Sequence, residues 1–413
     1  MDETPKIMSC RCCIVGGGPA GMVLGLLLAR AGVDTVVVEK HGDSLRDFRG
    51  DTIHPSTLEA LHDLGLLEDF LKLPHQKATL LKGKVGDVTI PLADFSHLPT
   101  HAKFIVFMPQ WDFLNFIASR AKRYPGFRLL MNTEADGLVV DQERVAGITA
   151  KTEDGPLTIR ADLTVGADGR HSLVREEAGF EPEEIGAPMD VLWFRLSRKD
   201  DDPQESFGRI DAGQMLVLIY RGEHWQCGYV IAKGSANRLK AQGIETLRKN
   251  IAELAPFLAG RTSELASFDD IKLLTVAVDR LATWHKPGLL CIGDCAHAMS
   301  PVGGVGINLA IQDAIAAANI LSEALCGEGP VTDADLARVQ ARREFPTKVT
   351  QSMQVFIQKR VISRILGGSG KMKPPWMVRL FIYFPLLRRL PAGLMGIGVR
   401  PERVTSPERA SRS

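Results

Sequence analysis

A glycine-rich string near the N-terminus, Gly16-Gly17-Gly18-Pro19-Ala20-Gly21, has the G-x-G-x-x-G spacing of a dinucleotide-binding turn. It follows the apolar segment 12–15, an expected strand, and precedes an expected helix over 22–30, rich in Leu and Ala. The first glycine allows a tight turn, the second lets the backbone approach a pyrophosphate, and the third lets the helix pack on the strand. We therefore expect phosphate binding by Gly16, Gly18, Pro19, Ala20 and Gly21, at a helix N-terminus.

A carboxylate stands where the ribose of such a cofactor would lie. Glu39 follows an expected second strand, Thr35-Val36-Val37-Val38, at the spacing from the glycines where an acid accepts hydrogen bonds from ribose hydroxyls. We expect Glu39 and the adjoining Lys40 to contact the cofactor. The alternative for Glu39 is a solvated carboxylate at a strand end.

Two more polar motifs come directly after apolar strands. Asp168 and Gly169 end the string Gly166-Ala167-Asp168-Gly169, and Asp294 follows Cys291-Ile292-Gly293. Taken singly, either aspartate is explained equally well as a turn or helix-capping residue. Asp168-Gly169 is expected to mark a βα turn on the nucleotide-binding sheet, and Asp294 to stand at another strand end.

The three motifs together resemble those of the single-component flavoprotein aromatic hydroxylases, and the order along the chain is the same. Gly25, Ala29 and Gly32 extend the first motif as in FAD-binding proteins. Arg170, Ser172 and Arg175 complete the second. Gly293-Asp294-Cys295-Ala296-His297 with Pro301 and Gly303-Gly304-Val305-Gly306-Ile307-Asn308 resembles the third. The resemblance covers residues 10–345 and is to the p-hydroxybenzoate hydroxylase-like group, near the ubiquinone-biosynthesis hydroxylases.

The resemblance implies further contacts with non-covalent FAD. Asp294 would accept a hydrogen bond from a ribityl hydroxyl of the flavin. A helix N-terminus after Gly303 would face the isoalloxazine ring, and the flavin contacts there would come from Pro301, Gly304, Val305, Gly306, Ile307 and Asn308. Arg49 would touch and gate the flavin, and Gln110 stands where many relatives have an FAD-contacting arginine. His297 would support the flavin loop rather than act as a base. Tyr220 is a candidate substrate contact, with packing as the alternative.

The implied function is an FAD-dependent monooxygenase that uses NAD(P)H and O2 to hydroxylate or epoxidise an aromatic or other electron-rich substrate through a C4a-hydroperoxyflavin. The reacting group belongs to the flavin, so no side chain is assigned as catalytic. The sequence has no second dinucleotide-binding string for NAD(P)H, which fits a transient co-substrate, and no W-x-W-x-I-P string of flavin halogenases. A flavin dehydrogenase or prenyl reductase, and a non-redox prenyl-binding escort-like protein, are the alternatives.

The expected fold is α/β: a Rossmann-like FAD layer of the glutathione-reductase type, an inserted antiparallel substrate sheet and a helical C-terminal tail. The FAD layer would comprise residues 1–74, 106–181 and 286–345, the substrate layer 75–105 and 182–285, and the tail 346–413. Leucines at helical spacing predict one helix over 55–72. Hydrophobic residues make up 45% and charged residues 24% of the 413, which excludes a disordered chain, and only 4 tyrosines leave little to stack on nucleic acid.

The charge distribution and the cysteine content indicate which surfaces the protein would contact and in which compartment it would lie. Residues 346–413 contain 13 Lys and Arg and 2 Glu, a net +11; because the whole chain carries +1, residues 1–345 carry −10. The apolar, basic segment 376–398 would either pack on the acidic body, closing the active site or a homodimer contact, or bind a membrane peripherally. Seven cysteines without zinc spacing predict free thiols, no metal and a cytoplasmic protein.

Overall fold

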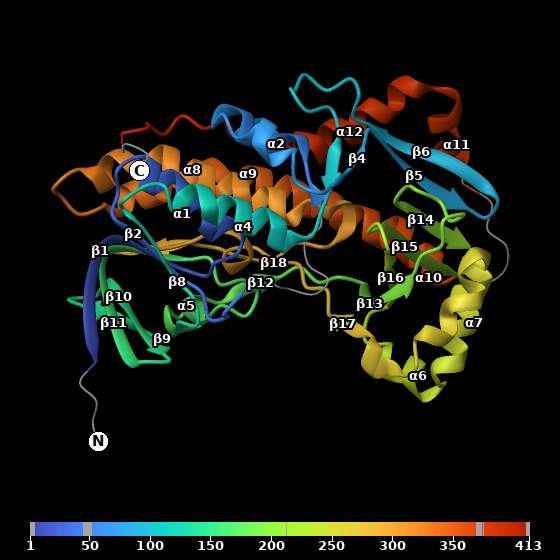
Figure 1. Cartoon of the computed structure of the whole chain (residues 1–413), viewed down its shortest axis with the longest axis horizontal. Coiled ribbons are helices and arrows are strands. Elements are labelled where there is room, and N and C mark those ends of the chain that lie inside the picture. The colour runs from blue at the N-terminus through green and yellow to red at the C-terminus, as the bar shows by residue number, and fades with distance from the viewer. Residues whose placement is uncertain (1–4, 44–51, 212, 369–373, 375, 410–413) are drawn as a thin grey trace.

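The fold is built on a mostly parallel sheet, in a computed structural model that describes residues 5–43, 52–211, 213–368, 374 and 376–409. The strand order is β19-β20-β11-β1-β2-β8, and all neighbours are parallel except β19 and β20. A hairpin formed by β9 and β10 extends the sheet along the long β11 (Figure 1). The strands are β1 (Lys6–Val15), β2 (Thr35–Val38), β8 (Phe127–Leu130), β9 (Glu134–Asp141), β10 (Arg144–Thr152), β11 (Gly155–Gly166), β19 (His285–Lys286) and β20 (Leu289–Cys291).

Helices cover one face of this sheet and form the main core with it. Alternate residues of β1 point to opposite faces, so Cys12 and Ile14 join the core beneath the helices while Cys13 and Val15 join the core beneath the β9–β10 hairpin. The first helix is buried from Ala20 to Ala29 because its neighbours enclose it on all sides. The covering helices are α1 (Pro19–Arg30), α2 (Pro55–Asp63), α3 (Leu67–Phe70), α4 (Gln110–Ala121), α8 (Gly306–Cys326) and α9 (Asp333–Ile357), with the short α5 (Leu173–Glu177) on the other face.

The second sheet has the order β17-β13-β16-β15-β14-β5-β6, antiparallel throughout except between β14 and β5. Helices α6 (Ala236–Ala241) and α7 (Ile244–Leu254) cover one face, and the C-terminal helices lie against the other (Figure 1). Its strands are β5 (Leu80–Val85), β6 (Val88–Asp94), β13 (Met189–Ser197), β14 (Phe207–Asp211), β15 (Gln214–Tyr220), β16 (His224–Ala232) and β17 (Lys272–Leu274). The α/β fold class with a separate, mainly antiparallel sheet is confirmed.

Two small sheets join these layers. One has the order β3-β7-β4 and the other pairs β12 with β18. Their strands are β3 (Thr52–Ile53), β4 (Gln76–Ala78), β7 (Ile105–Phe107), β12 (Pro182–Glu184) and β18 (Asp279–Leu281). The short β3 leads directly into α2, so it fixes where that helix begins.

The C-terminal part continues as helices after α9. A π-helical turn (Gln358–Ile362) and α10 (Ser363–Leu366) follow it, and then α11 (Trp376–Tyr383), a 3₁₀ turn (Pro385–Arg388) and α12 (Arg389–Gly396). The last described residues return along the helical layer, where Arg409 N donates to Arg30 O over 3.0 Å. The helical C-terminal region is therefore confirmed, and it is packed on the body at both ends.

Two predictions from the sequence, a helical segment over 55–72 and free cysteines, can be compared with the structure. The helical character predicted for 55–72 is confirmed, but with an interruption, because Gly65 adopts φ 67° and separates α2 from α3. All seven cysteines are free, and burial raises the pKa of Cys12 far above its usual value, so that thiol is held protonated in the core.

Helix α8, with its preceding turn, is long and apolar enough to cross a membrane, but 67% of its apolar window is buried inside the protein, as in a core helix.

Candidate functional site

The predicted motifs meet at one edge of the parallel sheet. The last residues of four neighbouring strands are in register: Val15 of β1 lies opposite Val38 of β2 and Gly166 of β11, and Gly166 lies opposite Cys291 of β20. The segments after these strands carry the glycine string, Glu39, Asp168 and Asp294, respectively. Because ligands of open α/β sheets bind outside the carboxyl ends of the strands, this edge is the candidate site.

Glycine is required at two positions of the first turn for packing. Gly16 has φ 110°, and a Cβ there would lie 2.4 Å from the Ala167 carbonyl oxygen of the neighbouring turn. A Cβ on Gly21 would lie 2.0 Å from the Gly16 oxygen, because α1 approaches the end of β1 so closely. Neither contact is compatible with a side chain.

Gly18 differs from both of them. It is the N-cap of α1 with φ −73°, a conformation open to any L-residue, and a Cβ would meet no atom within 4 Å. The fold itself therefore leaves this position free. A glycine that packing does not require, at the N-terminus of a helix, fits a site where a ligand's phosphate approaches the backbone.

Glu39 is held beside this turn. Its carboxylate accepts hydrogen bonds from Gly17 N (3.0 Å) and His41 N (3.1 Å), and its side chain is 11% exposed. Each oxygen retains acceptor capacity, so the geometry is compatible with ribose binding. Lys40 is exposed next to it.

Asp168 organises its own turn. Its carboxylate accepts hydrogen bonds from Ser172 Oγ (2.5 Å) and Val174 N (3.2 Å), at the start of α5. Burial raises the pKa of Asp168, although these hydrogen bonds oppose the shift. The side chain therefore shapes the turn that carries Gly169, and a direct contact with the cofactor stays a prediction.

Asp294 points toward the second motif. Its Oδ2 accepts a hydrogen bond from Arg170 Nε over 3.2 Å, and both side chains are about one-third exposed, at 31% and 29%. An aspartate that is held by one cation and still accessible suits the acceptor role predicted for a ribityl hydroxyl.

A buried ion network supports the turn before Asp294. Asp313 of α8 accepts from Gly293 N (3.1 Å) through Oδ2 and pairs with His297 Nε2 (2.6 Å) and Arg343 Nε (2.9 Å). Burial opposes ionisation, but His297 and Arg343 outweigh it and lower the pKa of Asp313. Arg343 also contacts Glu402 over 3.3 Å, so the network joins α8, α9 and the C-terminal tail. Asp313 and Arg343 are not among the site residues predicted from the sequence.

The segment after Pro301 is tied to β3 and α2 by Asn308. Its amide oxygen accepts from His54 N (2.8 Å) and Thr57 Oγ1 (2.8 Å), and its amide nitrogen donates to the Thr52 and Gly304 carbonyl oxygens over 3.1 and 3.3 Å. Asn308 therefore ties the turn Val302–Gly304 and the start of α8 to β3 and α2. Its amide makes these contacts rather than being offered to a ligand. Val305, Gly306 and Ile307 lie in the first turn of this helix or directly before it.

Other predicted contacts have different outcomes. Arg49 lies outside the described residues. Gln110 is the first residue of α4, is buried, and its Oε1 has no hydrogen-bond partner among the described residues. A buried acceptor without a partner is costly in an isolated protein, so it fits a ligand that donates there. The open position at Gly18, the carboxylates of Glu39 and Asp294, and Gln110 thus fit FAD.

The predicted substrate contact of Tyr220 is not supported. Alternate residues of β15 face opposite sides of its sheet, and Tyr220 packs edge-to-face on Trp225 (5.9 Å between ring centroids), on the side covered by α7. The opposite face carries Met215, Val217 and Trp193, and one of the two apolar clusters on that face also includes Val302, the residue after Pro301. Substrate contacts are therefore expected from this apolar face rather than from Tyr220.

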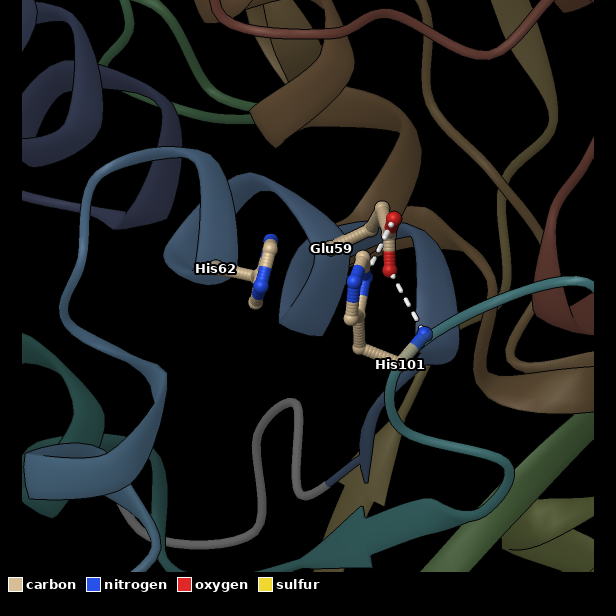
Figure 2. A group of neighbouring side chains, drawn as sticks. All are labelled: Glu59, His62 and His101. Atoms are coloured by element: carbon tan, nitrogen blue, oxygen red, sulfur yellow. Dashed lines mark hydrogen bonds and ion pairs between the residues drawn. The ribbon is translucent and has the colours of Figure 1, made fainter.

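One group of side chains resembles a metal site by proximity. Glu59 and His62 of α2 and His101 each offer a ligand atom, within 4.8 Å of one another (Figure 2). However, the two imidazole rings stack at 3.4 Å with 13° between their planes, and a metal must lie in the plane of each ring that ligates it. Glu59 also pairs with His101 (2.9 Å) and Arg403 (2.8 Å), so the group connects α2 to the C-terminal tail.

Comparisons with known proteins agree with this geometry. Residues 9–353 match the family model described as an FAD binding domain. The chain is 32% identical to a 6-methylpretetramide 4-monooxygenase of Streptomyces rimosus over 97% of this chain and 96% of that protein. Several other curated relatives, at 25–27% identity, are matched over only 61–65% of their own length.

Solved structures show the same fold. A variant of PqsL from Pseudomonas aeruginosa superimposes with a TM-score of 0.74 at 21% identity, covering 87% of this chain and 99% of that chain. The p-nitrophenol 4-monooxygenase PnpA of Pseudomonas putida superimposes with a TM-score of 0.73 at 19% identity, covering 94% and 96%.

Proposed function

Because the chain belongs to the FAD-binding-domain family of flavin monooxygenases, we propose that it hydroxylates a fused-ring aromatic substrate of the polyketide type. It is an FAD-dependent monooxygenase with NAD(P)H as the electron donor. The observation that carries the substrate proposal is the 32% identity to 6-methylpretetramide 4-monooxygenase across nearly the whole of both chains. Bound FAD supplies the chemistry of accepting hydride and activating O2.

The residues of this chain bind and orient the reactants. We assign the phosphates to the turn at Gly18 and the ribose to Glu39, and both assignments follow from the register of the strand ends. Asp313 and Asn308 are positioning residues, since each holds the backbone of a cofactor-binding turn and is itself buried.

We further propose a substrate chamber between the turn Val302–Gly304, which we assign to the flavin and call the flavin-binding loop, and the inner face of the second sheet. Val302 and the side chains of Met215 and Trp193 pack in one apolar cluster there, which suits a planar apolar substrate and excludes water from the reacting atoms. The proposed fused-ring substrate is an aromatic, lipophilic small molecule, as expected from the sequence, and a homodimer and cytoplasmic localisation remain parts of the proposal.

The test measures incorporation of oxygen into the product, with a panel of polyketide aromatics and simple phenols as substrates. Purified holoenzyme with NADH or NADPH under ¹⁸O2 is expected to place one labelled atom in a polyketide product, and simple phenols are expected to give little turnover. Product formed without O2 would support the dehydrogenase or prenyl reductase alternative. Binding of prenyl compounds without NAD(P)H oxidation would support the escort alternative. Turnover of phenols alone would refute the polyketide assignment.

A further inference from the structure

The helical segment α11–α12 exposes a concentrated set of large apolar side chains. Among the described residues, 13 large hydrophobic side chains are exposed, and six of them lie between positions 376 and 390. We call these six the C-terminal apolar surface: Trp376 (72% exposed), Tyr383 (71%), Phe384 (57%), Leu386 (67%), Leu387 (43%) and Leu390 (71%). Exposed apolar residues gathered in this way usually mark an interaction site.

This exposure is not caused by a detached helix, because the opposite side of α12 is packed on the body (Figure 1). Ala392 and Gly396 are buried, and a Cβ on Gly396 would lie 2.8 Å from Leu98. The Met395 carbonyl oxygen accepts a hydrogen bond from His54 Nδ1 (2.7 Å). The helix is therefore fixed by its small residues, and Leu390 near its start is left exposed.

The chain segment that carries this surface bears charge of one sign. Residues 346–401 contain ten Lys and Arg and no Asp or Glu. Arg379 and Arg389 are exposed within the two helices, and Arg388 donates to the Phe381 and Ile382 carbonyl oxygens at the end of α11. A second copy of this surface would bring cations against cations, so self-association through it is disfavoured, whereas an anionic surface is complementary.

We propose that the C-terminal apolar surface binds peripherally to anionic lipid bilayers. Each helix has eight residues, far below the ~20 needed to cross a bilayer, so the segment lies in the interface rather than spanning it. Trp376 and Tyr383 suit the headgroup layer, the leucines the acyl boundary, and the arginines the lipid phosphates. This proposal is independent of the substrate proposed above.

The experiment is flotation of the full-length holoenzyme with phosphatidylcholine vesicles, with and without about one-third phosphatidylglycerol. We expect binding to the anionic vesicles at low salt, at least tenfold weaker binding to neutral vesicles, and a steep decrease at high salt. Leu386→Glu with Leu390→Glu should weaken binding at least tenfold while flavin content and thermal unfolding stay unchanged, since both side chains are exposed.

The matched control places the same substitutions on exposed apolar residues elsewhere. Ile7→Glu with Val140→Glu changes side chains that are 66% and 60% exposed on β1 and β9, and binding should stay within twofold of the unmodified protein. No binding to anionic vesicles, or equal binding by the Leu386/Leu390 variant, would overturn the proposal. A dimer in sedimentation velocity that this variant abolishes, without vesicle binding, would assign the surface to a second copy and also overturn it.

Discussion

Replacing Gly18 by alanine should separate cofactor binding from folding. At this position φ is −73° and a Cβ contacts nothing within 4 Å, so the added methyl group introduces neither strain nor a clash in the protein. The loss of unfolded-state entropy stabilises the apoprotein while a poorer N-cap destabilises it, so its free energy of unfolding should change by less than about 1 kcal/mol. The methyl group nevertheless occupies the space proposed for the pyrophosphate, and overpacking of about 1–3 kcal/mol corresponds to a roughly 5- to 150-fold weaker FAD affinity.

The assay is FAD titration of the apoprotein by flavin fluorescence quenching, with urea unfolding of the same apoprotein. Gly260→Ala is the matched control, because that glycine is exposed, lies outside the site and would also meet no atom within 4 Å. Gly21→Ala is the opposite case, with a Cβ 2.0 Å from the Gly16 oxygen, and should destabilise the apoprotein itself. Unchanged FAD affinity in Gly18→Ala, or a large loss of apoprotein stability, would refute the assignment of this turn.

Two further predictions concern buried charge. Arg343→Met removes one of the two side-chain partners of buried Asp313 and leaves only His297. Because the side chains of Arg343 and Asp313 are 1% and 0% exposed, the substitution should cost about 3–5 kcal/mol in urea unfolding; Arg338→Met, at an exposed pair, should cost less than about 0.5 kcal/mol. Burial lowers the pKa of His54 to about 4. Stability should therefore be complete above pH 6.5 and decrease by about 3 kcal/mol as the pH falls to 4, because only the unfolded chain takes up the proton there. His54→Gln should show a smaller decrease over this range, and an identical pH profile for the two proteins would contradict the burial argument.

The parts of the site that could be predicted from sequence are those where a local backbone requirement selects the residue. Gly21 is explained by a contact within the first βαβ unit, and Gly16 by its own φ of 110° in the tight turn, so their spacing is visible in the sequence, although Gly16 also approaches Ala167 of the neighbouring turn. Strand ends followed by Asp168 and Asp294 are also local features. Their meeting at one edge follows from parallel pairing, which a repeated strand–helix order predicts.

The buried network around Asp313 could not be predicted in the same way. Its partners, His297, Arg343 and Gly293, are 16, 30 and 20 residues away, and nothing local specifies which of many charged residues will meet in the core. One signal was present: Asp313 is the only charged residue in the apolar run 309–318 of a helix, and a buried acid must be paired.

The orientation of Tyr220 shows a second feature that the sequence does not specify, namely which neighbour each face of a sheet has. Strand periodicity separates Tyr220 from Val217 and Ile219, but it does not say which face meets α7 and which meets the flavin-binding loop. That choice depends on helices distant in the sequence, so the sequence does not show that Tyr220 packs on the α7 side, away from the substrate position that we propose.

The C-terminal segment shows that packing on the body and binding a membrane are not exclusive alternatives. The net charge of +11 describes residues 346–413 as a whole, whereas the two faces of α12 have different partners. On the inner face, Met395 accepts a hydrogen bond from His54 and its side chain lies 3.6 Å from the position of a Cβ on Gly303, so α12 contacts the loop that we assign to the flavin. On the outer face, Leu390 remains in solvent. If the outer face binds lipid, the wall of the proposed substrate chamber is anchored at the membrane surface, where a fused-ring apolar substrate would concentrate.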